Sequence, residues 1–199
     1  MCGIVGYIGP KPAIDFLIDG LQKLEYRGYD SAGVAVLEEG ETEILKSVGK
    51  LAALQSKLNG SLKHALVGIG HTRWATHGRP SDLNAHPHSD CTGRFCVVHN
   101  GIIENYMPLK EWLLAEGHKF ESETDTEVIA HLMEHFYKGD LEKAVHKVLE
   151  KIRGSYALAI MTENEPDKII AVRKDSPLIV GLGRGENYLA SDIPAILKY

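Results

Sequence analysis

The chain has 199 residues, of which 44% are hydrophobic and 25% are charged, a composition typical of a folded globular domain that excludes a disordered or collagen-like chain. The 22 basic and 27 acidic residues leave a formal net charge of −5, and without a long basic stripe the chain is not expected to bind nucleic acid. No apolar run reaches the roughly 18–20 residues that a membrane-spanning helix needs, and the N-terminus lacks the pattern of a secretory signal.

The three cysteines, Cys2, Cys91 and Cys96, are few and odd in number. This favours free thiols over a disulfide framework and, together with the missing signal, predicts a cytoplasmic protein. Glycine is in excess, at 20 of 199 residues against a usual share of about 7%. Some backbone positions are therefore expected to need torsions or close contacts that only glycine allows.

The first half of the chain alternates strands with helices. Residues 3–8 form a short β-rich run, and apolar residues over 14–24 then recur at helical spacing. Residues 32–37 and 42–47 flank an acidic, glycine-containing turn, which predicts a β-hairpin and antiparallel pairing. A short helix over 51–58 and two buried strands over 65–71 and 95–100 follow.

The segment between these two buried strands, residues 72–92, is rich in Gly, Pro, His, Asn and Asp. It is predicted to be a long loop, and long loops in compact domains usually carry function or move. Functional residues are therefore expected in it.

Helices and then strands are predicted for the second half. Apolar stripes indicate helices around Trp112, over 128–136 and over 141–152. Thr124 and Glu127 have the spacing of a capping box, which predicts that the second of these helices begins there with Asp125 in its first turn. Strands are expected over 156–161, 168–172, 178–183 and 188–190.

Strands, then helices, then strands again indicate an α+β fold with mainly antiparallel sheets, and helices outside two stacked sheets would bury every apolar stripe. We find no repeat or flexible linker, so a single domain over residues 1–199 is predicted. The last residues carry no polar tail, and we expect the domain to be truncated at its C-terminus.

Cys2 follows the initiator methionine directly. Removal of Met1 would place a free α-amino group, with a pKa of about 8, on the residue that carries the thiol. Such a residue can act as nucleophile and base together. The alternative is a small apolar residue at the start of a strand, which is the commoner role of a cysteine.

Three further positions have the chemistry of an acyl-transfer site, each with a structural alternative. Arg73 at a strand end can bind a carboxylate in a bidentate manner or form a structural ion pair. Asn100 and the Gly101 N–H can form an oxyanion hole or a plain Asn-Gly turn. Asp125 can pair with a substrate ammonium or favour a helix start electrostatically.

Metal and nucleotide sites have weaker signals. Five histidines cluster in the sequence, and His86-Pro87-His88 resembles a ligand pair, but no two of these five have helical His-x-x-x-His spacing and no Cys-x-x-Cys occurs, so no metal is predicted. Cys91 and Cys96 have no helix start or basic cluster nearby and are interpreted as ordinary cysteines. The glycines at 181, 183 and 185 lack a Walker lysine and a following helix.

Five segments in chain order carry a resemblance to a known family: residues 2–6 (CGIVG), 24–33 (LEYRGYDSAG), 71–78 (HTRWATHG), 98–105 (VHNGIIEN) and 123–127 (ETDTE). Together they resemble the N-terminal-nucleophile, or class II, glutamine amidotransferases over essentially the whole chain. The middle motifs are similar to the glutaminase domains of glucosamine-6-phosphate synthases. They are unlike those expected in amidophosphoribosyltransferase, asparagine synthetase or glutamate synthase.

The resemblance implies a four-layer αββα sandwich that hydrolyses L-glutamine to L-glutamate and ammonia without a cofactor. It implies a role for each of ten residues: Cys2 as nucleophile, Asn100 and Gly101 as oxyanion donors, Arg27 and Gly28 as residues that orient the N-terminus, Arg73 and Asp125 as ligands of the substrate carboxylate and ammonium, and Trp74, Thr76 and His77 as pocket lining.

In the full-length relatives, the resemblance implies C-terminal sugar-isomerase domains that bind fructose 6-phosphate and use the ammonia, in a homodimer. These domains are not present before Tyr199, so this chain is expected to hydrolyse glutamine and to make no amino sugar. Two alternatives remain: the glutaminase domain of an amidophosphoribosyltransferase, and a glutamine-binding module without turnover. The joint presence of five residues counts against a module without turnover: Cys2, Arg73, Asn100, Gly101 and Asp125.

Overall fold

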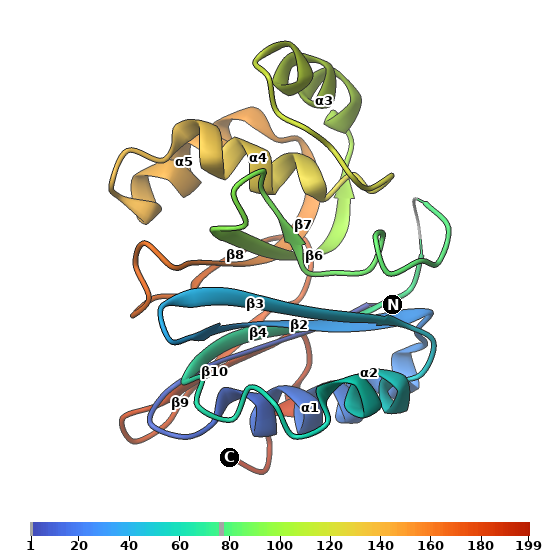
Figure 1. Cartoon of the computed structure of the whole chain (residues 1–199), viewed down its shortest axis with the longest axis vertical. Coiled ribbons are helices and arrows are strands. Elements are labelled where there is room, and N and C mark those ends of the chain that lie inside the picture. The colour runs from blue at the N-terminus through green and yellow to red at the C-terminus, as the bar shows by residue number, and fades with distance from the viewer. Residues whose placement is uncertain (1, 76–77) are drawn as a thin grey trace.

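The computed structural model describes residues 2–75 and 78–199, and it contains two antiparallel sheets stacked between two layers of helices (Figure 1). The six-stranded sheet has the order β3-β2-β4-β1-β10-β9 and the four-stranded sheet the order β5-β6-β7-β8. This is the αββα arrangement, and it confirms the predicted α+β class.

The strands of the larger sheet are β1 (Gly3–Ile8), β2 (Ser31–Glu38), β3 (Glu41–Val48), β4 (Val67–Arg73), β9 (Ile179–Leu182) and β10 (Asn187–Ala190). Those of the smaller sheet are β5 (His88–Ser89), β6 (Phe95–Ile103), β7 (Gly154–Thr162) and β8 (Ile170–Lys174). The hairpin predicted around residues 38–41 is the β2–β3 pair.

Helices cover the outer face of each sheet. Helices α1 (Ala13–Leu24) and α2 (Leu51–Leu58) lie on the larger sheet, and α4 (Glu127–Phe136) and α5 (Leu141–Lys151) lie on the smaller one, with α3 (Tyr106–Ala115) beside α4 (Figure 1). Two short 3₁₀ turns, η1 (Glu25–Arg27) and η2 (Ile193–Ala195), complete the elements. None of the described helices is long and apolar enough to cross a membrane.

The period-2 pattern of the strands separates the hydrophobic core into layers. In β6, Val97 packs with α4 and α5, whereas Cys96 and Val98 face the other sheet. In β1, Val5 faces the α1 layer while Ile4 lies between the sheets. Each central strand is therefore buried on both faces, which explains why these strands read as nearly continuous apolar runs.

The predicted start of α4 is wrong. The helix begins at Glu127 with Thr126 as its N-cap, without a side-chain capping bond. The Thr124 hydroxyl instead bonds to Ser122 and His88, and the Glu127 carboxylate accepts from the backbone N–H groups of residues 121 and 122. The Thr124 and Glu127 side chains therefore hydrogen-bond to groups outside the helix and do not cap its first turn. Asp125 lies before the helix and not in its first turn.

Two other boundaries differ from the sequence prediction. The loop expected over 72–92 is shorter, because β4 runs to Arg73 and β5 occupies His88–Ser89. Asn100 and Gly101 lie within β6, paired with Ala157 and Tyr156, and do not form a hairpin turn. Antiparallel pairing of Gly3 with Thr72 brings the start of β1 beside the end of β4, where the candidate site lies.

Candidate active site

A cavity of about 560 Å³ opens where the start of β1 meets the end of β4 and the middle of β6. It gathers residues from both sheets and from the loop before α4, and its lining extends in sequence from Cys2 to Pro177. Its lining includes seven of the ten predicted site residues: Cys2, Arg27, Arg73, Trp74, Asn100, Gly101 and Asp125. Thr76 and His77 lie outside the described residues.

The Cys2 thiol contacts only backbone among its described hydrogen-bond partners. Its Sγ accepts from Trp74 N at 3.1 Å and lies 3.4 Å from Trp74 O. Burial raises the pKa of this thiol, and the Trp74 N–H offsets part of the rise. The sulfur is therefore protonated at neutral pH, and a base is needed to activate it.

Asn100 is held in one orientation by a buried histidine. His71 Nε2 lies 2.9 Å from Asn100 Oδ1 and 3.0 Å from His99 O. Both partners are acceptors, so Nε2 carries the hydrogen. The amide oxygen of Asn100 thus faces His71, and its Nδ2 donates toward the Cys2 carbonyl oxygen at 3.2 Å. An amide N–H donor is presented beside the nucleophile.

Gly101 adopts a φ of +127°, in the region that favours glycine. A Cβ atom at this position would lie 2.0 Å from Ser155 O on the neighbouring strand. The residue must be glycine for both reasons, and its backbone passes along the cavity without a side chain in the way.

Arg73 forms the structural ion pair that was one of its two predicted roles, and it also lines the cavity. Its side chain is 4% exposed, and Nη1 lies 3.5 Å from Asp30 Oδ1. Nη2 donates to Gly78 O at 3.0 Å. The guanidinium forms a structural ion pair and also lines the cavity, so its charge reaches the site from a braced position.

Asp125 is buried in the connection between α3 and α4. Its Oδ2 accepts from Ile103 N at 2.7 Å, a bond that ties this connection to the end of β6. Asp125 also lines the cavity. A cationic group on the substrate would meet a negative charge there.

Arg27 and Gly28 act on the neighbourhood of Cys2 in different ways. The Arg27 guanidinium donates to Ser191 O at 3.3 Å and pairs with Asp192 at 3.6 Å. Ser191 Oγ in turn accepts from Ile4 N at 3.0 Å, so this network braces β1 two residues from the thiol. Gly28 lies under Trp74, since an added Cβ would be 2.5 Å from its ring.

Several other residues that line the cavity were not predicted from the sequence as site residues. They are His86, His99, Ile102, Glu104, Thr124, Thr126, Ser155, Ser176 and Pro177. His86 and His99 could have been identified from the sequence, because both are polar residues near or within apolar strands. Ser155 and Ser176, whose hydroxyls are 3.0 Å apart, could not be identified from the sequence. Only the pairing of distant strands places them in the cavity.

Four buried histidines, His71, His86, His88 and His99, form a neutral layer at the cavity, of which His86 and His99 line it directly. Burial lowers the pKa of His71 to about 3 and that of His99 to about 4. Burial also lowers the pKa values of His86 and His88 well below the usual range. The rings of His71 and His86 stack with centroids 4.2 Å apart, and the layer stays uncharged at neutral pH.

Comparisons with known proteins agree with this geometry. A family model described as a glutamine amidotransferase domain matches residues 71–198. Over its full length the chain is 59% identical to a protein named glutamine–fructose-6-phosphate aminotransferase (isomerizing) from Caldanaerobacter subterraneus, and 60% identical to one of the same name from Symbiobacterium thermophilum. The chain spans 33% of each of these relatives.

Solved structures show the same fold. A glutamine phosphoribosylpyrophosphate amidotransferase from B. subtilis aligns with a TM-score of 0.83 and 29% identity, over 98% of this chain and 42% of that one. A glutamine aminotransferase class-II domain protein from Silicibacter pomeroyi aligns with a TM-score of 0.58 at 17% identity, covering 96% and 88% of the two chains, and supports the fold alone. The chain belongs to the glutamine amidotransferase domain family.

Proposed function

We propose that this domain hydrolyses L-glutamine to L-glutamate and ammonia through a γ-glutamyl thioester on Cys2. The observation that carries the proposal is the convergence, in one cavity, of the Cys2 thiol, the Asn100 amide and the Arg73 and Asp125 charges. A thiol, an oxyanion donor and two opposite charges fit an amino acid with a side-chain carboxamide.

Substrate binding uses the two charges. Arg73, braced by Asp30, pairs with the α-carboxylate, and Asp125, anchored on Ile103 N, pairs with the α-ammonium. Trp74 lines the same cavity, and Thr76 and His77, which lie outside the described residues, stay substrate contacts predicted from the sequence. These contacts direct the carboxamide carbon toward Cys2.

The chemical step uses the thiol and the α-amino group of Cys2. Among the described residues no side-chain base contacts the Cys2 sulfur, so the α-amine that Met1 removal would expose takes the thiol proton. The sulfur attacks the carboxamide carbon, and the amide oxygen becomes an oxyanion held by Asn100 Nδ2 and the Gly101 N–H. The amine passes the proton to the departing ammonia. Water then hydrolyses the thioester and releases glutamate.

In the longer protein the ammonia would convert fructose 6-phosphate to glucosamine 6-phosphate. The support is the name of the 55–60% identical relatives, each about three times as long as this chain. We propose accordingly that sugar-isomerase domains follow the glutaminase domain, in a cytoplasmic homodimer. The amidophosphoribosyltransferase alternative is supported only by similarity of fold, at 28–29% identity. An assay of the full-length protein with each sugar phosphate as ammonia acceptor separates the two.

The decisive experiment varies the N-terminus. A fusion protein that a protease cleaves directly before Cys2 should release glutamate from glutamine only after cleavage, with mass spectrometry confirming the new terminus. Cys2→Ala should abolish glutamate release while the fold and some glutamine binding remain. Cys96→Ala, at a thiol buried between the sheets, is the matched control and should retain turnover. Full activity in the uncleaved fusion, or in the Cys2 variant, would overturn the mechanism.

A further inference from the structure

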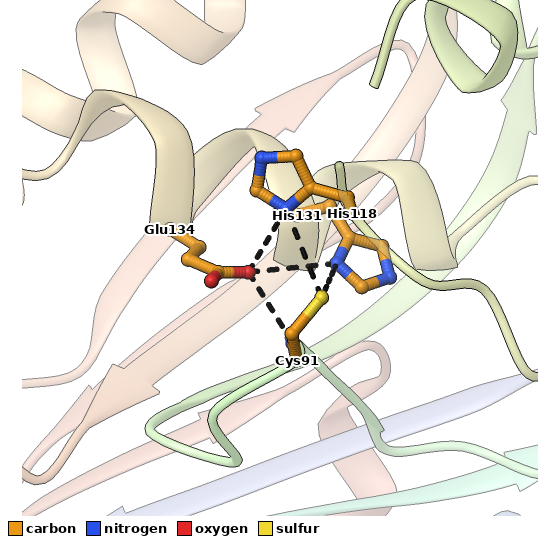
Figure 2. A group of neighbouring side chains, drawn as sticks. All are labelled: Cys91, His118, His131 and Glu134. Carbon is orange, nitrogen blue, oxygen red and sulfur yellow. Dashed lines mark hydrogen bonds and ion pairs between the residues drawn. The ribbon is translucent and has the colours of Figure 1, made fainter. Parts of the chain in front are cut away.

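Four potential metal ligands converge on the far side of the smaller sheet from the glutaminase cavity. Cys91 lies in the turn between β5 and β6, His118 in the connection after α3, and His131 and Glu134 on one face of α4. One ligand atom from each lies within 4.8 Å of the other three. Figure 2 shows the sulfur, two imidazole nitrogens and one carboxylate oxygen pointing toward a common centre.

The distances match those of a tetrahedral zinc site. Cys91 Sγ lies 3.5 Å from His131 Nδ1 and 3.9 Å from His118 Nδ1. Glu134 Oε2 lies 3.0 Å from His118 Nδ1 and 3.7 Å from His131 Nδ1. Zinc bonds of about 2.3 Å to sulfur and about 2.0 Å to nitrogen or oxygen, at tetrahedral angles, separate sulfur from nitrogen by about 3.6 Å and nitrogen from oxygen by about 3.3 Å.

The surroundings orient the four side chains as a metal centre requires. His131 Nε2 lies 3.4 Å from Glu127 Oε1, so that nitrogen donates its hydrogen to Glu127 and the lone pair of Nδ1 faces the centre. The Glu127 carboxylate is itself held by the N–H groups of Glu121 and Ser122. Such a carboxylate–histidine pair fixes the tautomer and the ring orientation of a ligand.

The environment of the Cys91 sulfur and the charges of the cluster also support a cation site. Lys119 N donates to Cys91 Sγ at 3.2 Å, a contact that stabilises a thiolate. Without a cation, the Nδ1 lone pair of His131 and the Glu134 carboxylate would face each other as two acceptors. A thiolate and a carboxylate carry two negative charges, and a divalent ion balances both.

We propose that Cys91, His118, His131 and Glu134 form a structural zinc site. One thiolate, two imidazoles and one carboxylate in tetrahedral geometry favour zinc over magnesium or calcium, which prefer all-oxygen sites. Because the chain supplies all four ligands, the ion has no open position for substrate and stabilises structure. It joins the β5–β6 turn to α4 and to the connection that carries Asp125.

The test measures metal content and ligand identity directly. The purified, tag-free protein, stripped with a chelator and then given zinc, should retain one zinc per chain after gel filtration. Cobalt in place of zinc should give the visible bands of tetrahedral cobalt and a near-ultraviolet thiolate-to-cobalt charge-transfer band. At free zinc of about 100 times Kd, the melting temperature should rise by roughly 5–10 °C.

Variants separate this site from other zinc-binding groups. Cys91→Ser should remove the charge-transfer band and weaken zinc binding by more than about 100-fold, and His118→Gln should weaken it similarly while the band of any remaining cobalt complex persists. Glu127→Gln should weaken binding by about 10–100-fold, because it removes only the orienting partner of His131. Cys2→Ala and His146→Gln, which change a thiol and an exposed histidine elsewhere, should bind zinc like the parent.

Cys91 is exposed and His118 is only partly buried, so their variants should fold, and unchanged circular dichroism will establish this. The proposal is overturned if the stripped protein takes up less than about one-tenth of an equivalent of zinc. It is also overturned if zinc binding survives in Cys91→Ser and is lost in Cys2→Ala. In the first case the cluster is a hydrogen-bonded network that holds no metal.

Discussion

At the scale of single residues, the site depends on how buried groups orient their neighbours. Asn100 can donate toward the nucleophile only if its amide is not flipped, and His71 Nε2–H decides this by donating to Asn100 Oδ1. The low pKa of His71, about 3 because of burial, keeps the ring neutral and its tautomer constant over the working pH range. His71 is therefore a positioning residue that acts through Asn100.

This role predicts a difference between two variants of His71. Glutamine can place an amide N–H near the position of the imidazole Nε2, whereas leucine cannot. We expect His71→Leu to lower kcat for glutamine hydrolysis by about 10- to 100-fold, less than the loss of a whole oxyanion donor, with KM changed little. His71→Gln should recover most of kcat, and equal kcat values in the two variants would contradict the positioning role.

A substitution at Asp125 can remove its negative charge and keep its hydrogen bond from Ile103 N. In Asp125→Asn the amide oxygen can still accept from Ile103 N, so the fold should remain, but the negative charge is lost. We expect KM for glutamine to rise by about 30-fold or more, because an unpaired buried charge costs roughly 2–5 kcal/mol. Steady-state kinetics check this, with the melting temperature as a control for folding. An unchanged KM would place the ammonium elsewhere.

At the scale of elements, the close pairing of β6 and β7 brings the Gly101 backbone, as well as the Asn100 side chain, to the cavity. Gly101 passes so close to Ser155 that no Cβ fits, and its φ of +127° is costly for other residues. The proposed oxyanion donor Gly101 is thus part of a central strand of the smaller sheet. Strand pairing holds it more rigidly than the hairpin turn that the Asn-Gly dipeptide suggests.

Alanine substitutions at two glycines test this constraint. Gly93 has a φ of +75° with open space around its Cα, whereas an added Cβ at Gly101 would meet Ser155 O at 2.0 Å. Gly93→Ala should lower the free energy of unfolding by about 1–2 kcal/mol, the cost of the left-handed backbone alone. Gly101→Ala should lower it by at least about 3 kcal/mol, since the strand must also move. Chemical denaturation checks the difference, and equal losses would contradict the close strand approach.

At the scale of the whole molecule, the two sheets enclose a layer of neutral histidines. Their pKa values are lowered in the fold, mainly by burial, to about 3 for His71 and about 4 for His99. Between those values and the usual pKa of about 6.5 the unfolded chain binds more protons than the folded one. The stability that these groups contribute is present above pH 6.5 and is lost as pH falls toward 4.

The expected outcome is a steep acid limb in thermal stability. Each buried neutral histidine contributes up to about 1.4 kcal/mol of lost stability per pH unit below pH 6.5. Melting temperatures measured from pH 7.5 to 4.5 should fall continuously below about pH 6.5. His88→Gln should make this limb shallower and His64→Gln, at an exposed position, should not. A flat profile down to pH 5 would show that the layer takes up protons freely.

The order and type of the elements could be predicted from the sequence because they depend on local periodicity. The apolar stripe of α5, the β2–β3 hairpin and the central strands all have patterns that extend over neighbouring residues. The start of α4 could not be predicted in the same way. The Thr124 hydroxyl and the Glu127 carboxylate are used by groups of the preceding loop and of β5, so the local capping pattern did not apply.

The sequence by itself determined the family and the α+β class and supplied the candidate reactive groups, because motif and spacing are properties of neighbouring residues. Only the tertiary structure decided how the site residues are held, with Arg73 against Asp30 and Asn100 against His71. It also decided that Cys91 lies beside residues 118, 131 and 134. Each of these contacts joins segments that are distant in the chain. Their partners depend on strand register and helix packing, and no local pattern records either.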